Sequence, residues 1–103
     1  LEVKAGSKIA LEFTNDDDML HNVVIVQPET ADEVGKAALG LGLNGEKMHY
    51  VPETDQVLFH TPVIQPGGSE TIYFTAPEEP GTYTFVCTFP GHYISMRGTL
   101  VVK

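Results

Sequence analysis

The sequence is poor in several features that would place it in other classes of protein. It has one cysteine in 103 residues, which excludes an internal disulfide and a binuclear centre bridged by two thiolates. No stretch approaches the ~20 apolar residues of a membrane-spanning helix, so direct insertion into a membrane is not expected. Six Lys and Arg stand against fourteen Asp and Glu, a net charge of −8, which argues against nucleic acid and anionic lipid as partners. A basic protein partner fits this charge, and acidity that only keeps a small protein in solution fits it equally well.

The chain carries a series of short strand patterns separated by turns. Ile9, Leu11 and Phe13 alternate with polar or small residues across 8–14, which predicts a strand with one buried face. Similar patterns predict further strands at 1–4, 21–26, 56–61, 71–75, 82–87 and 98–102. About seven short strands with turn signals every ~8 to 12 residues are typical of an antiparallel Greek-key β-sandwich. A chain of this length buries only about two-thirds of its unfolded surface, so residues 1–103 are expected to form a single domain.

One segment between the strand patterns has helical spacing. Apolar residues recur at that spacing across 31–41, although glycines in the segment weaken the pattern. Thr30 and Glu33 predict a capping box at the start of this helix. The predicted fold class is therefore all-β, a sandwich with one short helical insertion.

The residues that suggest a chemistry lie near the end of the chain. Cys87, His92 and Met96 bring a thiol, an imidazole and a thioether together within ten residues, and Pro90 and Gly91 predict a turn between the first two. Such a loop can wrap a soft metal. A zinc site would want more thiolate or imidazole ligands. Copper that cycles between two oxidation states suits two imidazoles, one thiolate and a weak axial thioether.

The loop lacks a second imidazole, which another histidine of the chain must supply. His21 is the best candidate because it opens the apolar run 23–26 and is followed by Asn22, which can brace a neighbouring loop. His49 has no ligand neighbour at a useful spacing. His60, which precedes a Thr-Pro pair, is interpreted as a surface residue of a strand.

Other features have an ordinary structural interpretation. Met48 is interpreted as a packing residue. The acidic run 16–18 lacks the spaced ligands of a calcium loop and predicts a solvated turn. A lone cysteine is normally a buried, inert side chain, and His92 on this view is only a loop residue.

His21-Asn22, followed much later by the run from Cys87 to His92 and then by Met96, resembles the blue-copper cupredoxins, and among them the azurin and auracyanin group. The five-residue step from Cys87 to His92 and the four-residue step to Met96 are those of azurin. Parts of the last two predicted strands also resemble the family, so the resemblance spans nearly the whole chain. This coincidence of spacings outweighs the ordinary interpretations of Cys87 and His92.

The resemblance implies one type 1 copper site that holds Cu+ or Cu2+. Its metal ligands would be His21, Cys87, His92 and Met96. Around them the resemblance implies roles for Asn22, Thr88 and Phe89. The backbone N–H groups of Asn22 and Phe89 would point at the sulfur of Cys87, and the side chain of Asn22 would tie the His21 strand to the Cys87 loop through Thr88.

The resemblance also implies a function, which is one-electron transfer between redox partners and not enzyme catalysis. Cytochromes or copper enzymes would be the partners, and they would dock at the end of the molecule where His92 reaches the surface. Residues expected around that point are Met19, Leu20, Pro90, Gly91 and Ile94. The family implies export, so a periplasmic or cell-surface location is expected.

The sequence departs from the family at its start, because cupredoxins carry a further strand before the one that 1–4 resembles. The preferred explanation is a domain cut from a longer protein, and the other is a sheet edge that a partner or a second copy covers. The first explanation leaves open a copper module fused to a larger redox enzyme or membrane-anchored protein. A metal-free β-sandwich used for binding is a weaker alternative. A cysteine hydrolase built on Cys87 is weaker still, since no cleft-sized second layer is predicted.

Overall fold

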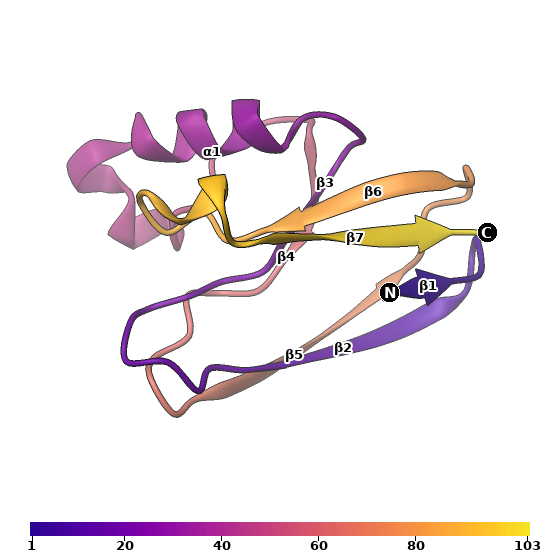
Figure 1. Cartoon of the computed structure of the whole chain (residues 1–103), viewed down its shortest axis with the longest axis horizontal. Coiled ribbons are helices and arrows are strands. Elements are labelled where there is room, and N and C mark those ends of the chain that lie inside the picture. Colours follow the sequence, from indigo (N-terminus) through magenta and orange to yellow (C-terminus); the bar gives the residue numbers. More distant parts are fainter.

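All 103 residues are described by the computed structural model, whose strands form two sheets packed face to face (Figure 1). One sheet has the strand order β1-β7-β6-β3-β4, and the other pairs β2 with β5. The strands are β1 Glu2–Val3, β2 Lys8–Thr14, β3 Val24–Val26, β4 Val57–His60, β5 Ser69–Thr75, β6 Gly81–Val86 and β7 Arg97–Val102. All pairs are antiparallel except β1 with β7. The predicted all-β sandwich is confirmed, although several strands are shorter than expected.

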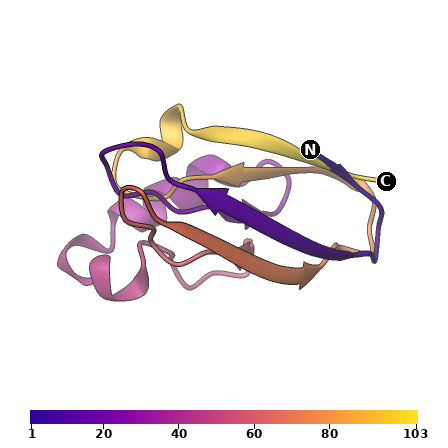
Figure 2. The same ribbon diagram turned by 90° about the horizontal axis from the view of Figure 1, so that it is seen from below.

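The two-stranded sheet follows the alternation that the sequence predicts. In β2 the apolar residues Ile9, Leu11 and Phe13 are partly buried, and the residues between them are exposed. The partner strand β5 runs antiparallel, with Ile9 opposite Phe74 and Leu11 opposite Ile72. Figure 2 shows this pair of strands in front of the larger sheet.

The edge of β2 that faces away from β5 has no paired strand. Between β2 and the larger sheet lies an apolar groove of about 420 Å³, whose lining includes Leu11, Phe13, Ile25 and Phe85. An unpaired edge of this kind offers N–H and C=O groups to a further strand or a partner. The expectation that residues outside this domain cover the edge stays a prediction.

β3 lies in the larger sheet and is buried on both faces. Ile25 faces the second sheet and packs with Tyr83 and Leu100. Val24 and Val26 belong to a separate cluster that includes Val34 of the helix. This strand therefore shows no alternation of apolar and polar residues, because a helix covers the face that solvent would otherwise reach.

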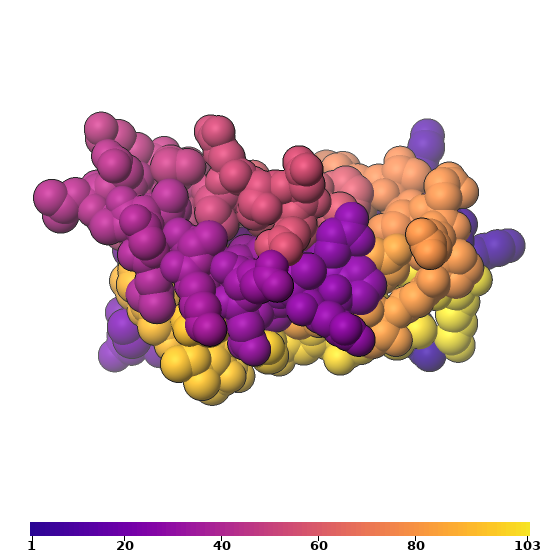
Figure 3. All heavy atoms as spheres, turned by 90° about the horizontal axis from the view of Figure 1, so that it is seen from above, coloured from indigo at the N-terminus to yellow at the C-terminus, as the bar shows by residue number.

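The single α-helix, α1 Ala31–Leu39, lies over the outer face of the larger sheet (Figure 1), and its residues form part of the upper surface in Figure 3. The 3-10 turns η1 Gly42–Asn44 and η2 Glu46–Met48 follow it, so the helix is shorter than predicted. The predicted capping box is wrong. The hydroxyl of Thr30 donates to the carbonyl of Gln27 at 2.7 Å, and the carboxylate of Glu33 accepts a hydrogen bond from Gln56. No helix of the structure combines the length and the apolar character needed to cross a membrane.

Gly35 lies inside α1, although glycine weakens helices, because the ring of Tyr93 occupies the space beside it. A Cβ atom on Gly35 would lie 2.1 Å from Cγ of Tyr93. Gly35→Ala must therefore displace this buried ring, and we expect it to lower the free energy of unfolding by about 1–3 kcal/mol, measured with urea. Gly40→Ala is the control, because its Cβ would meet only backbone oxygens, at 3.4 Å or more. Equal losses for the two variants would contradict the expectation.

Candidate metal centre

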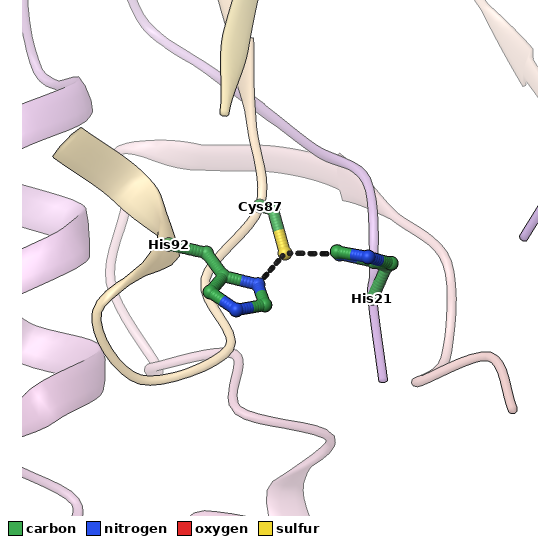
Figure 4. A group of neighbouring side chains, drawn as sticks. All are labelled: His21, Cys87 and His92. Carbon is green, nitrogen blue, oxygen red and sulfur yellow. Dashed lines mark hydrogen bonds between the residues drawn. The ribbon is translucent and has the colours of Figure 1, made fainter. Parts of the chain in front are cut away.

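Three side chains from two parts of the chain, the segment before β3 and the loop after β6, meet at one end of the sandwich (Figure 4). Sγ of Cys87 lies 3.7 Å from Nδ1 of His21 and 3.5 Å from Nδ1 of His92. One potential ligand atom from each residue lies within 4.8 Å of the other two. The structure therefore places His21, which is 66 residues from Cys87 in sequence, beside the Cys87 loop.

His21 is held by backbone hydrogen bonds on the segment that leads into β3. Its N–H donates to the carbonyl of Ile64 at 3.3 Å, and its own carbonyl accepts from the N–H of Ile64 at 2.7 Å. The side chain of His21 is 3% exposed. The ring is thus fixed by the scaffold and shielded from water.

The loop after β6 positions the other two side chains. The N–H of Cys87 donates to the carbonyl of Met96 at 2.9 Å, and the N–H of Met96 donates to the carbonyl of His92 at 2.9 Å. Gly91 has a φ of +86°, the left-handed conformation that favours glycine, at the turn predicted there. His92 then begins the 3-10 turn η3 His92–Ile94.

The side chain of Asn22 links the two segments that carry the potential ligands. Its Nδ2 donates to Oγ1 of Thr88 at 2.9 Å and to the carbonyl of His49 at 2.9 Å, and its Oδ1 accepts from the N–H of Thr88 at 2.8 Å. Asn22 and Thr88 are both almost completely buried. The expected link from the His21 segment to the Cys87 loop through Thr88 is present.

Burial shifts the pKa values of Cys87 and His92 toward their neutral forms. Burial raises the pKa of the Cys87 thiol, and the backbone N–H groups of Asn22 and Phe89 act in the opposite direction. Burial lowers the pKa of His92, the nearby His21 lowers it further, and the carboxylate of Asp17 opposes both. The neutral forms of Cys87 and His92 are therefore favoured when no cation is bound. A metal ion would stabilise the thiolate and would need the unprotonated imidazole nitrogens.

The donor set fits copper. Structural zinc normally takes four nitrogen or sulfur ligands, whereas two imidazoles and one thiolate with a weak axial sulfur suit copper. A cavity of about 230 Å³ at this end is lined by His21, Cys87 and Met96, among other residues. The role of Met96 as a fourth ligand stays a prediction.

The remaining histidines lie outside this cluster. Nδ1 of His49 accepts from the N–H of Val63 at 3.2 Å, and Nδ1 of His60 lies 3.0 Å from the carbonyl oxygen of Thr61. Neither ring belongs to the group of side chains that could share a metal. The structural interpretation of both stays a prediction, and the hydrogen-bond partners of both rings are consistent with it.

Asp17 is the residue near the site that sequence reasoning missed. The run 16–18 is exposed at a bend, as the sequence predicts, but Oδ2 of Asp17 also lies 2.8 Å from Nε2 of His21. The hydrogen bond with His21 is the main cause that holds the pKa of Asp17 below its usual value. The four-residue step from Asp17 to His21 is the signal that the sequence contained.

Known proteins similar to this chain are copper proteins. The family described as copper binding proteins, plastocyanin/azurin family, matches residues 1–103. Auracyanin-B and auracyanin-A of Chloroflexus aurantiacus are 36% and 34% identical, over 99% and 100% of this chain but 44% and 64% of their own lengths. An azurin of Pseudomonas aeruginosa is 34% identical over 82% of this chain and 57% of its own length. The chain thus spans less than two thirds of these curated relatives.

Solved structures of similar proteins share the fold as well. Dithionite-reduced auracyanin from Roseiflexus castenholzii has a TM-score of 0.88 and 37% identity, and the match covers 100% of this chain and 82% of that one. Auracyanin A of Chloroflexus aurantiacus, described as a "blue" copper protein, has a TM-score of 0.88 and 32% identity over 100% and 84% of the two chains. These solved structures therefore match this chain over its whole length, both in fold and in sequence.

Proposed function

Because the chain belongs to the plastocyanin/azurin family of copper-binding proteins, we propose that it forms a type 1 copper domain that carries single electrons between redox proteins. The observation that carries the proposal is the convergence of His21, Cys87 and His92, whose ligand atoms lie within 4.8 Å of one another. Copper held by such a set alternates between two oxidation states with little change in geometry.

The chain's own residues have separate tasks in this proposal. The hydrogen bonds between Asn22 and Thr88 keep the two ligand-bearing segments at a fixed separation, so the ligands need not rearrange when the charge changes. The backbone N–H groups of Asn22 and Phe89 withdraw negative charge from the sulfur, which favours the reduced metal. The ligands would be Nδ1 of His21, Sγ of Cys87, Nδ1 of His92 and, as the weak fourth, Met96.

Voltammetry of the copper-loaded protein tests this function. We expect one reversible one-electron couple that survives repeated scans, and no such couple from the metal-free protein. If copper binds but gives no reversible couple, the protein is a metal-binding domain and the proposed electron-carrier function is wrong.

We propose redox proteins such as cytochromes or copper enzymes as the partners, in a periplasm or at a cell surface. The docking surface would surround His92, which is partly exposed at its end of the molecule. Exposed apolar side chains near it in the chain are Ile94 and Met96, and Met19 is exposed on the loop before His21. An apolar surface of this kind suits brief contact with a partner that must also leave.

Ile94→Lys should slow electron exchange with a small basic c-type cytochrome by about tenfold, which corresponds to ~1.4 kcal/mol of lost docking free energy. The reason is that Ile94 is 71% exposed on η3, beside His92, so a lysine there would place a charge in the apolar contact. The visible colour of the copper site should not change. Stopped-flow mixing of the reduced cytochrome with the oxidised protein measures the rate.

Tyr73→Lys is the matched control for this variant. Tyr73 is also an exposed apolar residue, but it lies on β5 in the other sheet, so the same change of charge falls outside the proposed surface. If both variants slow electron exchange with the cytochrome equally, the change in net charge is responsible and the proposed docking surface is wrong.

A further inference from the structure

The imidazole of His21 is held on both sides. Its Nδ1 faces Sγ of Cys87 at 3.7 Å, and its Nε2 lies 2.8 Å from Oδ2 of Asp17. The side chain of His21 is 3% exposed, while that of Asp17 is 50% exposed. A carboxylate therefore reaches in from the surface to a buried ring whose other nitrogen faces the proposed metal.

The carboxylate of Asp17 is itself positioned by the loop that carries it. Oδ1 of Asp17 accepts a hydrogen bond from the N–H of Asp18 at 2.8 Å. The backbone N–H of Asp17 donates to Oδ1 of Asn15 at 3.0 Å. Asn15 is buried, and its Nδ2 donates to the carbonyls of Met19 and Ile64 at 2.8 and 2.9 Å. Ile64 is the residue whose backbone also holds His21. Asp17 and His21 are thus anchored to one point of the scaffold.

The other imidazole of the cluster has no such partner. The side chain of His92 makes a hydrogen-bond contact only with Sγ of Cys87, and the ring lies against the ring of Phe89 at a centroid distance of 4.9 Å. The two imidazoles therefore differ in their surroundings. Of the two imidazoles, only that of His21 is hydrogen-bonded to a carboxylate.

We propose that Asp17 is a positioning residue of the copper site, which fixes the tautomer of His21 and favours the oxidised metal through its charge. This inference rests on the proposed function. A carboxylate that accepts the Nε2–H of a histidine leaves Nδ1 free as a ligand and makes that nitrogen more basic. A more basic ligand stabilises the more highly charged metal, so Asp17 lowers the reduction potential.

The first test compares the reduction potentials of the wild type, D17N and D16N. D17N keeps an oxygen that can accept from Nε2–H but removes the charge, so we expect a blue protein with a higher potential. At a given applied potential, the ratio of oxidised to reduced copper should fall about tenfold. For one electron this corresponds to a rise of about 59 mV in the reduction potential. D16N is the matched control, since it removes the same charge from an exposed neighbour that makes no hydrogen bond to His21. Equal shifts in D17N and D16N would overturn the inference.

The second test uses the metal-free protein, so it does not depend on copper. Nitrogen-15 chemical shifts of His21, recorded where the ring is neutral, report which nitrogen carries the proton. We expect the Nε2–H tautomer in the wild type, and in D17A a fall in its ratio to the other tautomer of about tenfold. An unchanged ratio in D17A would overturn the positioning role, even if copper binds. A wild-type protein with the expected tautomer and no blue copper complex would instead overturn the proposed function alone.

Discussion

Cys87→Ser should remove the visible colour of the copper-loaded protein and weaken copper binding by about 100-fold or more. The thiolate is the one soft anionic donor in the cluster, and the sulfur–copper bond is the source of the colour in blue-copper proteins. A serine hydroxyl stays protonated at neutral pH and is a harder ligand, so it cannot take over either role. Absorption spectra and competition with a copper chelator measure the two effects.

The fold should survive this substitution. Burial favours the neutral thiol in the metal-free protein, so serine replaces one small uncharged group with another, at a cost of about 1–2 kcal/mol. Met96→Leu is the control at the site, because loss of a weak axial ligand should leave the colour in place. A Cys87→Ser protein that keeps an intense visible band would contradict the assignment of the sulfur as a ligand.

Asn22→Ala should lower the free energy of unfolding of the metal-free protein by roughly 3–5 kcal/mol. The substitution removes three hydrogen bonds and leaves the N–H of Thr88 and the carbonyl of His49 without these partners. Each buried polar group left unsatisfied costs about 1–3 kcal/mol, and a small domain has only about 5–15 kcal/mol in total. Urea denaturation measures the loss.

Asn44→Ala provides the comparison for Asn22→Ala. Asn44 is exposed on η1 and its side chain makes no hydrogen bond, so its loss should change stability by less than about 0.5 kcal/mol. A loss below about 1 kcal/mol for Asn22→Ala would mean that the link between the two ligand-bearing segments contributes little to the fold.

The parts of the structure that the sequence predicted are those set by local pattern. Alternation across 8–14 predicted β2 and its buried face, since a strand's period depends only on its own residues. The spacing of Cys87 and His92 placed both on one loop, and the apolar run after His21 placed this histidine close to a buried strand, although β3 begins only at Val24.

The parts that failed depend on partners distant in sequence. The capping box was wrong because Glu33 bonds with Gln56, 23 residues away, instead of with the start of its helix. The role of Asp17 was missed because its loop is anchored through Asn15 to Ile64, which is 49 residues further along the chain. A run of acidic residues shows nothing of this anchoring, so the sequence predicted only the exposed turn that the run forms.

The central claim is that His21 and the distant loop that carries Cys87 and His92 form one copper site. Titration of the metal-free protein with Cu2+, followed by visible absorption, tests it most directly. We expect an intense band that grows linearly and stops at one equivalent of copper in the wild type, and no such band when His21 is replaced with alanine. A protein that binds copper without this band, or that keeps the band unchanged without His21, would contradict the account.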